Sequence, residues 1–502
     1  MPDTEQLTPG RVAGRLFGLA PDRDERAPQL CQEALLTLAL NGYEHAGGDE
    51  LGNPPKRERF GLRSLALGHN FLEARADGRA GDDETTPQLY GQRLALGEEM
   101  RGSANLGLAR EALEGLIDPD TRKGQRGGWL LFPFHESLLW YDARRQGANG
   151  RWGVRRVWMR GSGITLARLL VDPPSGEETR ALGASAVAAM RETLQASSPL
   201  AVIAEQLERP LSEGAQVADP ADKEAWRLGG DERLAGLADR VCRHAEGILR
   251  QGGASGPARL WQLRSVLALD LATHSLRAAW DRTGTPGERR FLLLSFGGPP
   301  RAENRLRQRS EAAFDASRIT MREAILATLS TAMRELGAEE HPNWQEQFVS
   351  RRDKLQNQID ELKAGGLDAE GYDRIAREVL DNADYTRPVG GFQGLLQTAG
   401  LLAGSGQYRY MTASPELFSA LVGALSAEMP MSSDQFFARL QEEWGVVVGQ
   451  QAAAQTGLAT EVDGAELERN ARRAEQQLAD SGLALALSDR TTMVGERAAR
   501  NP

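Results

Sequence analysis

Positive charge and tryptophan are concentrated in residues 122–160, which we call the basic window. Nine Lys or Arg side chains stand there against two acids, a formal charge of +7, whereas the whole 502-residue chain carries −10. Four of the nine tryptophans lie in the same window. Because cations bind phosphates and aromatic faces stack on bases, this combination is typical of a surface that binds DNA or RNA. The side chains predicted to contact nucleic acid are Arg144, Arg145, Arg151, Trp152, Arg155, Arg156, Trp158 and Arg160.

Two other interpretations of the basic window stay open. Its arginines could contact an acidic protein partner, because clustered positive charge attracts any surface of opposite sign. Alternatively, its aromatic side chains belong to an ordinary core and its arginines form a solvated outer face.

A second group of arginines follows a loop of glycine and proline, residues 297–300. On the helix expected after this loop, Arg305 and Arg309 are one turn apart and share a face. The N-terminus of a helix attracts phosphate groups. The sequence therefore adds Arg301, Arg305 and Arg309 to the predicted nucleic-acid contacts. Ion pairs between Arg307 and neighbouring glutamates are the structural alternative.

The residues closest to a catalytic set lie around the start of the basic window. They are Asp118, Asp120, Lys123, His135 and Glu136. Metal-dependent nucleases use carboxylates to bind a metal ion and a lysine to stabilise charge. The strand-borne Asp/Glu-x-Lys pattern of such sites does not follow at a suitable spacing. A divergent metal-dependent nuclease is therefore an alternative function, and we assign no catalytic residue and no metal ligand.

Common cofactor motifs are absent from the sequence. It has no GxxxxGK[ST] loop, no GxGxxG after a strand, no GxSxG elbow and no CxxC. The six histidines are scattered, and His274 is expected to be a hydrogen-bonded core residue. Cys31 and Cys242 lie in helix-like apolar patterns that predict buried structural thiols. We therefore expect no cofactor and a function that is not enzymatic.

The sequence also bears on the compartment. No segment approaches the ~18 uninterrupted apolar residues of a membrane helix. Residues 1–10 are polar and acidic, unlike a secretory signal. These two features predict a cytoplasmic protein without membrane contact.

The spacing of apolar residues predicts a mainly helical, multidomain fold. Its expected helices include Gln29–Leu40, Ile164–Leu170, Leu260–Trp280, Arg318–Leu336 and Trp344–Leu362. The apolar majority of Leu260–Trp280 predicts a position at the centre of a bundle. Aromatic and β-branched runs at 129–134, 138–141 and 154–160 predict a small β-rich insertion near residues 125–163, and Phe291–Phe296 predicts a buried strand.

Residues 407–450 have the pattern helix, turn, helix and strand. Ser414 followed by Pro415 predicts a helix to Leu425, and Ser432 or Ser433 predicts the start of a second helix to Trp444. With a strand at 445–449, the segment is compatible with a winged-helix-like module. Acids outnumber arginines on the second helix, which favours a role in protein interaction over major-groove reading. A DNA-binding regulator is a further alternative.

The predicted domains follow these patterns. They are a helical domain at 1–118, a basic, aromatic and β-rich region at 119–175, a helical bundle at 176–400, the winged-helix-like module at 401–450, and an Ala-rich, partly flexible tail at 451–502 with one helix over 464–478.

The C-terminal motifs resemble the end of large helical subunits of prokaryotic genome-defence systems. The resemblance lies in Tyr408–Tyr410, Ser414–Leu417, Gln435–Phe437 and Trp444–Gly449. It implies a subunit that accompanies an ATPase, a helicase or a nuclease in an anti-phage complex, and it transfers no functional residue. We therefore expect a non-enzymatic scaffold or adaptor subunit of a cytoplasmic multiprotein complex that contacts nucleic acid or an acidic partner.

Overall fold

The protein is described by a computed structural model. The described residues are 9–21, 25–40, 56–60, 132–139, 141–143, 161–196, 201–202, 216–218, 231–251, 254–297, 304–336, 368–382, 384–426, 429–488 and 491–495. Within these ranges the fold is mainly helical with a few small sheets, as the sequence predicts.

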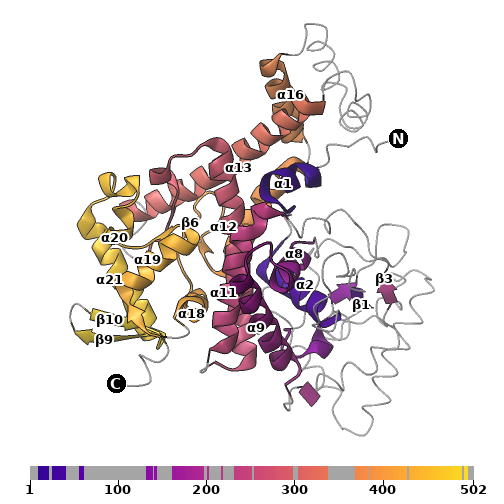
Figure 1. Cartoon of the computed structure of the whole chain (residues 1–502). Coiled ribbons are helices and arrows are strands. Elements are labelled where there is room, and N and C mark those ends of the chain that lie inside the picture. Colours follow the sequence, from indigo (N-terminus) through magenta and orange to yellow (C-terminus); the bar gives the residue numbers. More distant parts are fainter. Residues whose placement is uncertain are drawn as a thin grey trace, which may run out of the picture.

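The α-helices surround one long central helix (Figure 1). They are α1 (Pro9–Phe17), α2 (Ala27–Leu40), α8 (Ser162–Val171), α9 (Glu177–Leu194), α11 (Ala235–Arg250), α12 (Gly256–Thr283), α13 (Arg305–Leu336), α16 (Ala369–Asn382), α17 (Arg387–Ala399), α18 (Pro415–Leu425), α19 (Ser433–Trp444), α20 (Gln450–Ala453) and α21 (Gly464–Asp480). The 3-10 helices are η2 (Glu136–Leu138), η4 (Glu232–Leu234), η5 (Gly287–Arg289), η7 (Asp384–Thr386) and η8 (Gly457–Thr460). Among the described helices, none is both long enough and apolar enough to span a membrane.

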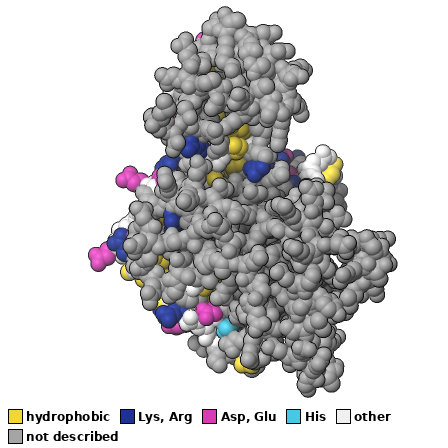
Figure 2. All heavy atoms as spheres, turned by 90° about the vertical axis from the view of Figure 1, so that its right-hand side faces the viewer, with side chains coloured by type: hydrophobic (Ala, Val, Ile, Leu, Met, Phe, Trp, Pro, Cys, Tyr) yellow, Lys and Arg dark blue, Asp and Glu magenta, His cyan; other side chains and the backbone are white. Residues whose placement is uncertain are grey.

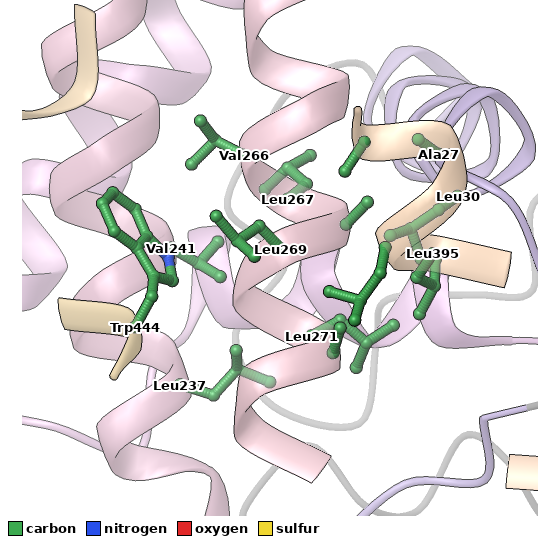
Figure 3. Packing of buried hydrophobic residues seen from close by; sticks show 14 of the residues in the cluster. Ala27, Leu30, Leu237, Val241, Val266, Leu267, Leu269, Leu271, Leu395 and Trp444 are labelled. Atoms are coloured by element: carbon green, nitrogen blue, oxygen red, sulfur yellow. The ribbon is translucent and has the colours of Figure 1, made fainter. Parts of the chain in front are cut away.

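The central helix α12 confirms the strongest helix prediction. Ser255 caps its N-terminus, and Gly284 ends it in the left-handed region with φ of 65°. Every residue from Gln262 to Leu276 is buried, so the helix is covered on all sides. Helices α2, α11, α13, α17 and α18 pack around it. Figure 3 shows side chains from several of these elements meeting those of α12.

One hydrophobic cluster runs through the described parts of the chain. Its members extend from Val12 in α1 to Val494 near the C-terminus. It therefore takes in described residues from all five predicted domain ranges, whose boundaries stay predictions. In Figure 1 the C-terminal elements α18–α21 lie on one side of α12, and α2, α8 and α9 lie on the other.

The strands form small sheets between distant segments. They are β1 (Lys56–Phe60), β2 (Tyr141–Ala143), β3 (Gln216–Ala218), β4 (Leu292–Leu293), β5 (Leu402–Ala403), β6 (Tyr410–Met411), β7 (Met431–Ser432), β8 (Val446–Val447), β9 (Ala484–Ser488) and β10 (Thr491–Val494). The sheet orders are β2-β1-β3, β7-β10-β9, β4-β8 and β5-β6. Strand β4 lies within the predicted strand Phe291–Phe296 and is buried.

The predicted β-rich insertion is only partly described. The strand prediction is wrong over residues 132–134, because Pro133 lacks an N–H and Phe134 donates instead to the carbonyl of Phe132 at 2.9 Å. Strand β2 pairs in parallel with β1, and β1 pairs antiparallel with β3. This small sheet is thus built from segments far apart in sequence. The predicted strand at 154–160 lies outside the described residues.

The two C-terminal helices begin where their caps predict. Ser414 accepts the N–H of Leu417 at 3.1 Å, and Ser432 forms a capping box with Gln435. Strand β8 follows α19 as expected, but it pairs in parallel with β4. The strand that directly follows the second helix therefore does not pair with a later strand of the same module, and the winged-helix arrangement is not confirmed.

The tail contains the predicted helix and adds a hairpin. Helix α21 matches the expected helix over 464–478, and strand β10 pairs antiparallel with β9 on one side and with β7 on the other. Ala474, Leu478 and Val494 belong to the main hydrophobic cluster. The described part of the tail is therefore anchored to the core through α21 and β10.

Asn470 ties α21 to the ends of β4 and β8. Its buried amide donates to the carbonyls of Leu294 at 2.9 Å and Val448 at 2.8 Å, and its carbonyl accepts the N–H of Phe296 at 2.8 Å. Asn470→Ala leaves these backbone groups without their partner, so we expect the free energy of unfolding to fall by about 2 kcal/mol. Urea denaturation measures this.

The matched control for Asn470 is Gln476→Ala on the same helix. Gln476 is exposed and its amide donates to Asp480 at 2.7 Å, within one turn. We expect that variant to change the free energy of unfolding by less than about 0.5 kcal/mol. Equal losses in the two variants would contradict the role of Asn470.

Candidate functional site

A cleft of about 600 Å³ opens between α1, the start of α11, α12 and α13. Its charged lining consists of five arginines and two carboxylates, a formal charge of +3 in a chain that is acidic overall. The arginines are Arg15, Arg233, Arg240, Arg277 and Arg282, and the carboxylates are Asp281 and Glu335. We call this site the arginine cleft.

Helical spacing places these side chains on the walls of the cleft. On η4 and α11, the lining residues Arg233, Gly236 and Arg240 recur every three or four positions. On α12, His274, Arg277 and Asp281 recur in the same way. Each helix therefore turns one charged face toward the cleft while its opposite side packs in the core.

The outer arginines have partners within the protein. Arg15 forms an ion pair with Glu335 at 2.7 Å, and Arg282 donates to the carbonyl of Ala327 at 2.8 Å. The Nε of Arg233 lies 2.8 Å from a carboxylate oxygen of Asp231. These contacts hold the rim of the cleft in place.

Arg277 connects the cleft to the end of α19. Its Nη2 donates to the backbone carbonyls of Glu442 at 2.8 Å and Glu443 at 2.9 Å. Burial, together with the charge of Arg240, lowers the pKa of Arg277 to about 10. The guanidinium therefore stays protonated at neutral pH, and it neutralises the partial negative charge at the C-terminus of α19.

Arg240 is the most deeply placed cation of the cleft. Its side chain is 8% exposed, and its Nε lies 4.0 Å from an oxygen of Asp270. Neither Nε nor Nη2 has a hydrogen-bond partner among the described residues. Burial lowers the pKa of Arg240, and the nearby carboxylates of Asp270 and Glu443 oppose this effect. A buried charge with unused donors is unfavourable unless an acceptor completes its surroundings.

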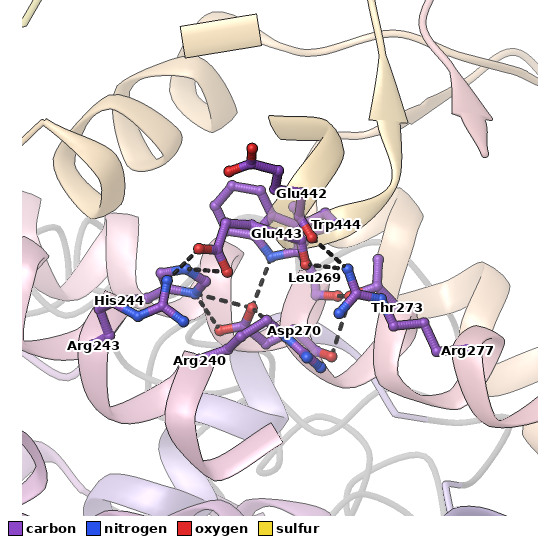
Figure 4. Close-up of polar contacts among 10 residues, drawn as sticks. All are labelled: Arg240, Arg243, His244, Leu269, Asp270, Thr273, Arg277, Glu442, Glu443 and Trp444. Atoms are coloured by element: carbon purple, nitrogen blue, oxygen red, sulfur yellow. Dashed lines mark hydrogen bonds and ion pairs between the residues drawn. The ribbon is translucent and has the colours of Figure 1, made fainter. Parts of the chain in front are cut away.

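The carboxylate of Asp270 is shared among several groups behind the cleft (Figure 4). It accepts the indole N–H of Trp444 at 2.7 Å and lies 3.0 Å from the Nδ1 of His244. All three residues are fully buried. Because Trp444 and His244 already occupy this carboxylate, Arg240 approaches it only to 4.0 Å.

Glu443 completes this group of charges above His244. Its carboxylate lies 3.6 Å from the Nε2 of His244 and pairs with Arg243. Burial alone would lower the pKa of His244, but Asp270 and Glu443 raise it above its usual value. Burial opposes ionisation of Glu443, yet His244 and Arg243 lower its pKa to about 2. The group therefore consists of charged forms that stabilise one another.

His274 supplies a neutral imidazole to the cleft. Its Nε2 lies 2.7 Å from the carbonyl oxygen of Phe17, and burial with the charges of Arg240 and Arg277 lowers its pKa to about 4. Since a carbonyl only accepts, Nε2 carries the hydrogen and Nδ1 carries the lone pair. The expectation of a hydrogen-bonded core histidine is confirmed.

The predicted phosphate contacts on α13 are partly described. Arg305 is exposed in the first turn, while Arg309 pairs with Glu461 at 3.1 Å. At the start of the helix, Glu466 accepts the N–H of Leu306 at 3.1 Å, and Asn304 accepts the N–H of Arg307 at 3.0 Å. These donors are already used by the protein. Phosphate binding by Arg305 and Arg309 stays a prediction, and Arg301 lies outside the described residues.

The alternative ion pair on this helix is present. Arg307 lies 3.5 Å from Glu311, and its guanidinium also stacks 4.0 Å from the ring centre of Tyr410. On the face in Figure 2, described Lys and Arg side chains are scattered among Asp and Glu. All eight contact residues of the basic window lie outside the described ranges, so nucleic-acid binding there stays a prediction.

The nuclease alternative can be followed at two of its five residues. His135 is buried, and Glu136 accepts from the amide of Gln195 at 3.1 Å. Asp118, Asp120 and Lys123 lie outside the described residues. Over the part of the chain that the structure describes, no group of three or more His, Cys, Asp or Glu side chains could hold a metal ion.

The predicted burial of both cysteines is confirmed. The thiol of Cys242 donates to the carbonyl of Leu169 at 3.4 Å, and burial raises its pKa to about 12. It therefore remains a neutral thiol within the helix packing.

The comparisons with known proteins give no relative for this site. The chain matches no model of a known protein family, no curated protein and no solved structure. The arginine cleft was not predicted from the sequence. One available signal was Asp270, a carboxylate within the apolar run of α12, since a buried acid requires cationic or donor partners.

Proposed function

We propose that this protein is a non-enzymatic binding subunit of a larger assembly and that its arginine cleft binds an anionic group. The observation that carries this proposal is the charge of the cleft, where five arginines face two carboxylates and Arg240 is a buried cation whose Nε and Nη2 have no hydrogen-bond partner among the described residues. An oxyanion in the cleft would bring negative charge beside this buried cation.

The surroundings of Arg240 favour an external anion over a shift toward Asp270. The carboxylate of Asp270 already accepts from Trp444 and contacts His244. Arg277 lines the cleft from α12 and also remains protonated. Two arginines near each other repel in a site of low dielectric constant, and an anion between them relieves this repulsion.

The arrangement supports recognition of a ligand. Four of the five cleft arginines, Arg15, Arg233, Arg277 and Arg282, are fixed by contacts with backbone carbonyls or carboxylates, and the Nε2 of His274 is held by Phe17. Such preorganised donors bind an anion with little loss of side-chain freedom. The volume of about 600 Å³ matches sites for small molecules.

The wider role that we propose follows the resemblance to subunits of prokaryotic defence complexes. In that setting the basic window would contact DNA, RNA or an acidic partner, and the arginine cleft would be a separate, smaller site. An ATPase, a helicase or a nuclease is the kind of partner that the resemblance implies.

We expect inorganic phosphate to bind the full-length protein saturably in isothermal titration calorimetry at fixed ionic strength. Arg240→Gln should weaken this binding by about tenfold or more, since a hydrogen bond to a charged group contributes about 1.5–3 kcal/mol. Fixed ionic strength, set with sodium chloride, separates site binding from screening.

The control for the phosphate titration is Arg472→Gln. Arg472 is 73% exposed and pairs within its own helix with Glu468 at 3.3 Å. That variant should bind phosphate as the wild-type protein does. Absence of saturable binding, or equal binding by the Arg240 variant, would overturn the proposed anion site.

A further inference from the structure

We infer that the arginine cleft takes the dianionic phosphate group of a small, hydroxylated phosphate monoester. This inference rests on the proposed anion-binding function and specifies its ligand. It draws on three features of the described residues: the excess of positive charge around the cleft, the cleft volume, and the neutral imidazole of His274.

The charge excess exceeds what a monoanion neutralises. The lining residues alone carry a formal charge of +3. Their ionisable partners, together with the neighbours of Asp270, add four carboxylates and three basic groups: Asp231, Asp239, Asp270 and Glu443, and Arg243, His244 and Arg290. With His244 protonated, the form that Asp270 and Glu443 favour, the excess among these residues is +2.

A phosphate monoester matches this excess better than a carboxylate or a sulfate ester does. At neutral pH its phosphate group carries a charge of about −1.5 to −2 and offers three acceptor oxygens. Arg240 and Arg277 present planar donor groups from neighbouring helices, α11 and α12. Guanidinium groups recognise phosphate oxygens in pairs, so two arginines can engage one phosphate from two sides.

The cleft also has room for the organic part of the ligand. Its volume of about 600 Å³ lies in the range of sites for whole small molecules, well above the space of one phosphate. The lone pair on the Nδ1 of His274 has no partner among the described residues and can accept a hydrogen bond from a hydroxyl. The ligand is therefore a phosphate ester that carries hydroxyl groups.

The test compares glucose 6-phosphate with glucose 6-sulfate by calorimetry on the full-length protein. The two esters share one alcohol and differ by about one unit of charge near pH 7.5, because the second phosphate pKa is about 6. We expect glucose 6-phosphate to bind at least about tenfold more tightly than its sulfate, and Arg277→Gln to reduce this preference. Arg472→Gln should retain it.

The outcomes separate this inference from the proposed function. Equal binding of both esters, or binding of inorganic phosphate without binding of either ester, would overturn the inference while the anion site stands. If inorganic phosphate also fails to bind, the proposed function fails with it. A 5′-phosphorylated oligonucleotide that binds more tightly than glucose 6-phosphate would identify a nucleic-acid end as the source of the phosphate and overturn the small-molecule ligand.

Discussion

Asp270→Ala is expected to lower the free energy of unfolding by about 3–5 kcal/mol, the usual result of removing one partner from a buried charged group. The wild-type carboxylate is fully buried, accepts from Trp444 at 2.7 Å and contacts His244 at 3.0 Å. It is also the carboxylate nearest to Arg240, at 4.0 Å. Alanine therefore leaves an indole N–H and nearby buried cations without their acceptor. Urea denaturation near neutral pH measures the change.

Two further variants separate the charge of Asp270 from its shape. Asp270→Asn keeps an oxygen for the indole of Trp444 but loses the negative charge, so a loss of stability close to that of alanine would assign the effect to charge. Asp281→Ala is the exposed control on the same helix, since its side chain is 68% exposed and pairs with Arg290. We expect that control to lower the free energy of unfolding by less than about 1 kcal/mol. A similarly small loss of stability in Asp270→Ala would contradict the stabilising role of the buried network around Asp270.

The second large expected effect is a loss of protein stability in acid, and it comes from His274. The pKa of this buried imidazole is about 4 in the folded protein, against an ordinary value of 6.5. The unfolded chain therefore binds a proton at a pH where the folded protein does not. The contribution of His274 to stability is complete above pH 6.5 and is lost as the pH falls toward about 4. The expected loss is about 3 kcal/mol.

Replacing His274 by glutamine should flatten the dependence of the free energy of unfolding on pH between about pH 6.5 and 4. The glutamine amide can still donate to the carbonyl of Phe17, but it does not titrate. His244 acts in the opposite sense, because its pKa is raised, so its contribution is present at low pH and is lost as the pH rises through its folded value. The difference between the wild-type and variant profiles, measured by urea denaturation between about pH 7.5 and 4.5, isolates His274. Parallel profiles would contradict its low pKa.

Local features of the chain were sufficient to predict most of the described helices. Ser414 with Pro415, and Ser432 with Gln435, act on backbone groups within one turn, so their caps predict where α18 and α19 begin. The apolar majority of 260–280 likewise predicted a helix buried on all sides. Local pattern was misleading at 132–134, where the missing N–H of Pro133 outweighed the β propensity of its aromatic neighbours.

Pairings between distant segments could not be predicted in this way. Strand β8 satisfied a local strand pattern, yet its partner is β4 rather than a following strand, and this pairing separates the observed arrangement from the expected winged helix. Two-residue strands carry almost no register information of their own. Their pairing depends on where α12, α13 and α19 bring them together.

The amino-acid sequence by itself determined the helical class, the helix ends marked by caps, and the burial of α12 and of both cysteines, because these depend on interactions over a few residues and on the exclusion of apolar surface from water. Only the tertiary structure decided the arginine cleft. Asp270 meets His244 across 26 positions and Trp444 across 174, and the cleft arginines come from separate helices. Burial then changes their chemistry. A cation in a site of low dielectric constant needs a nearby anion, whereas the same side chain in water does not need one.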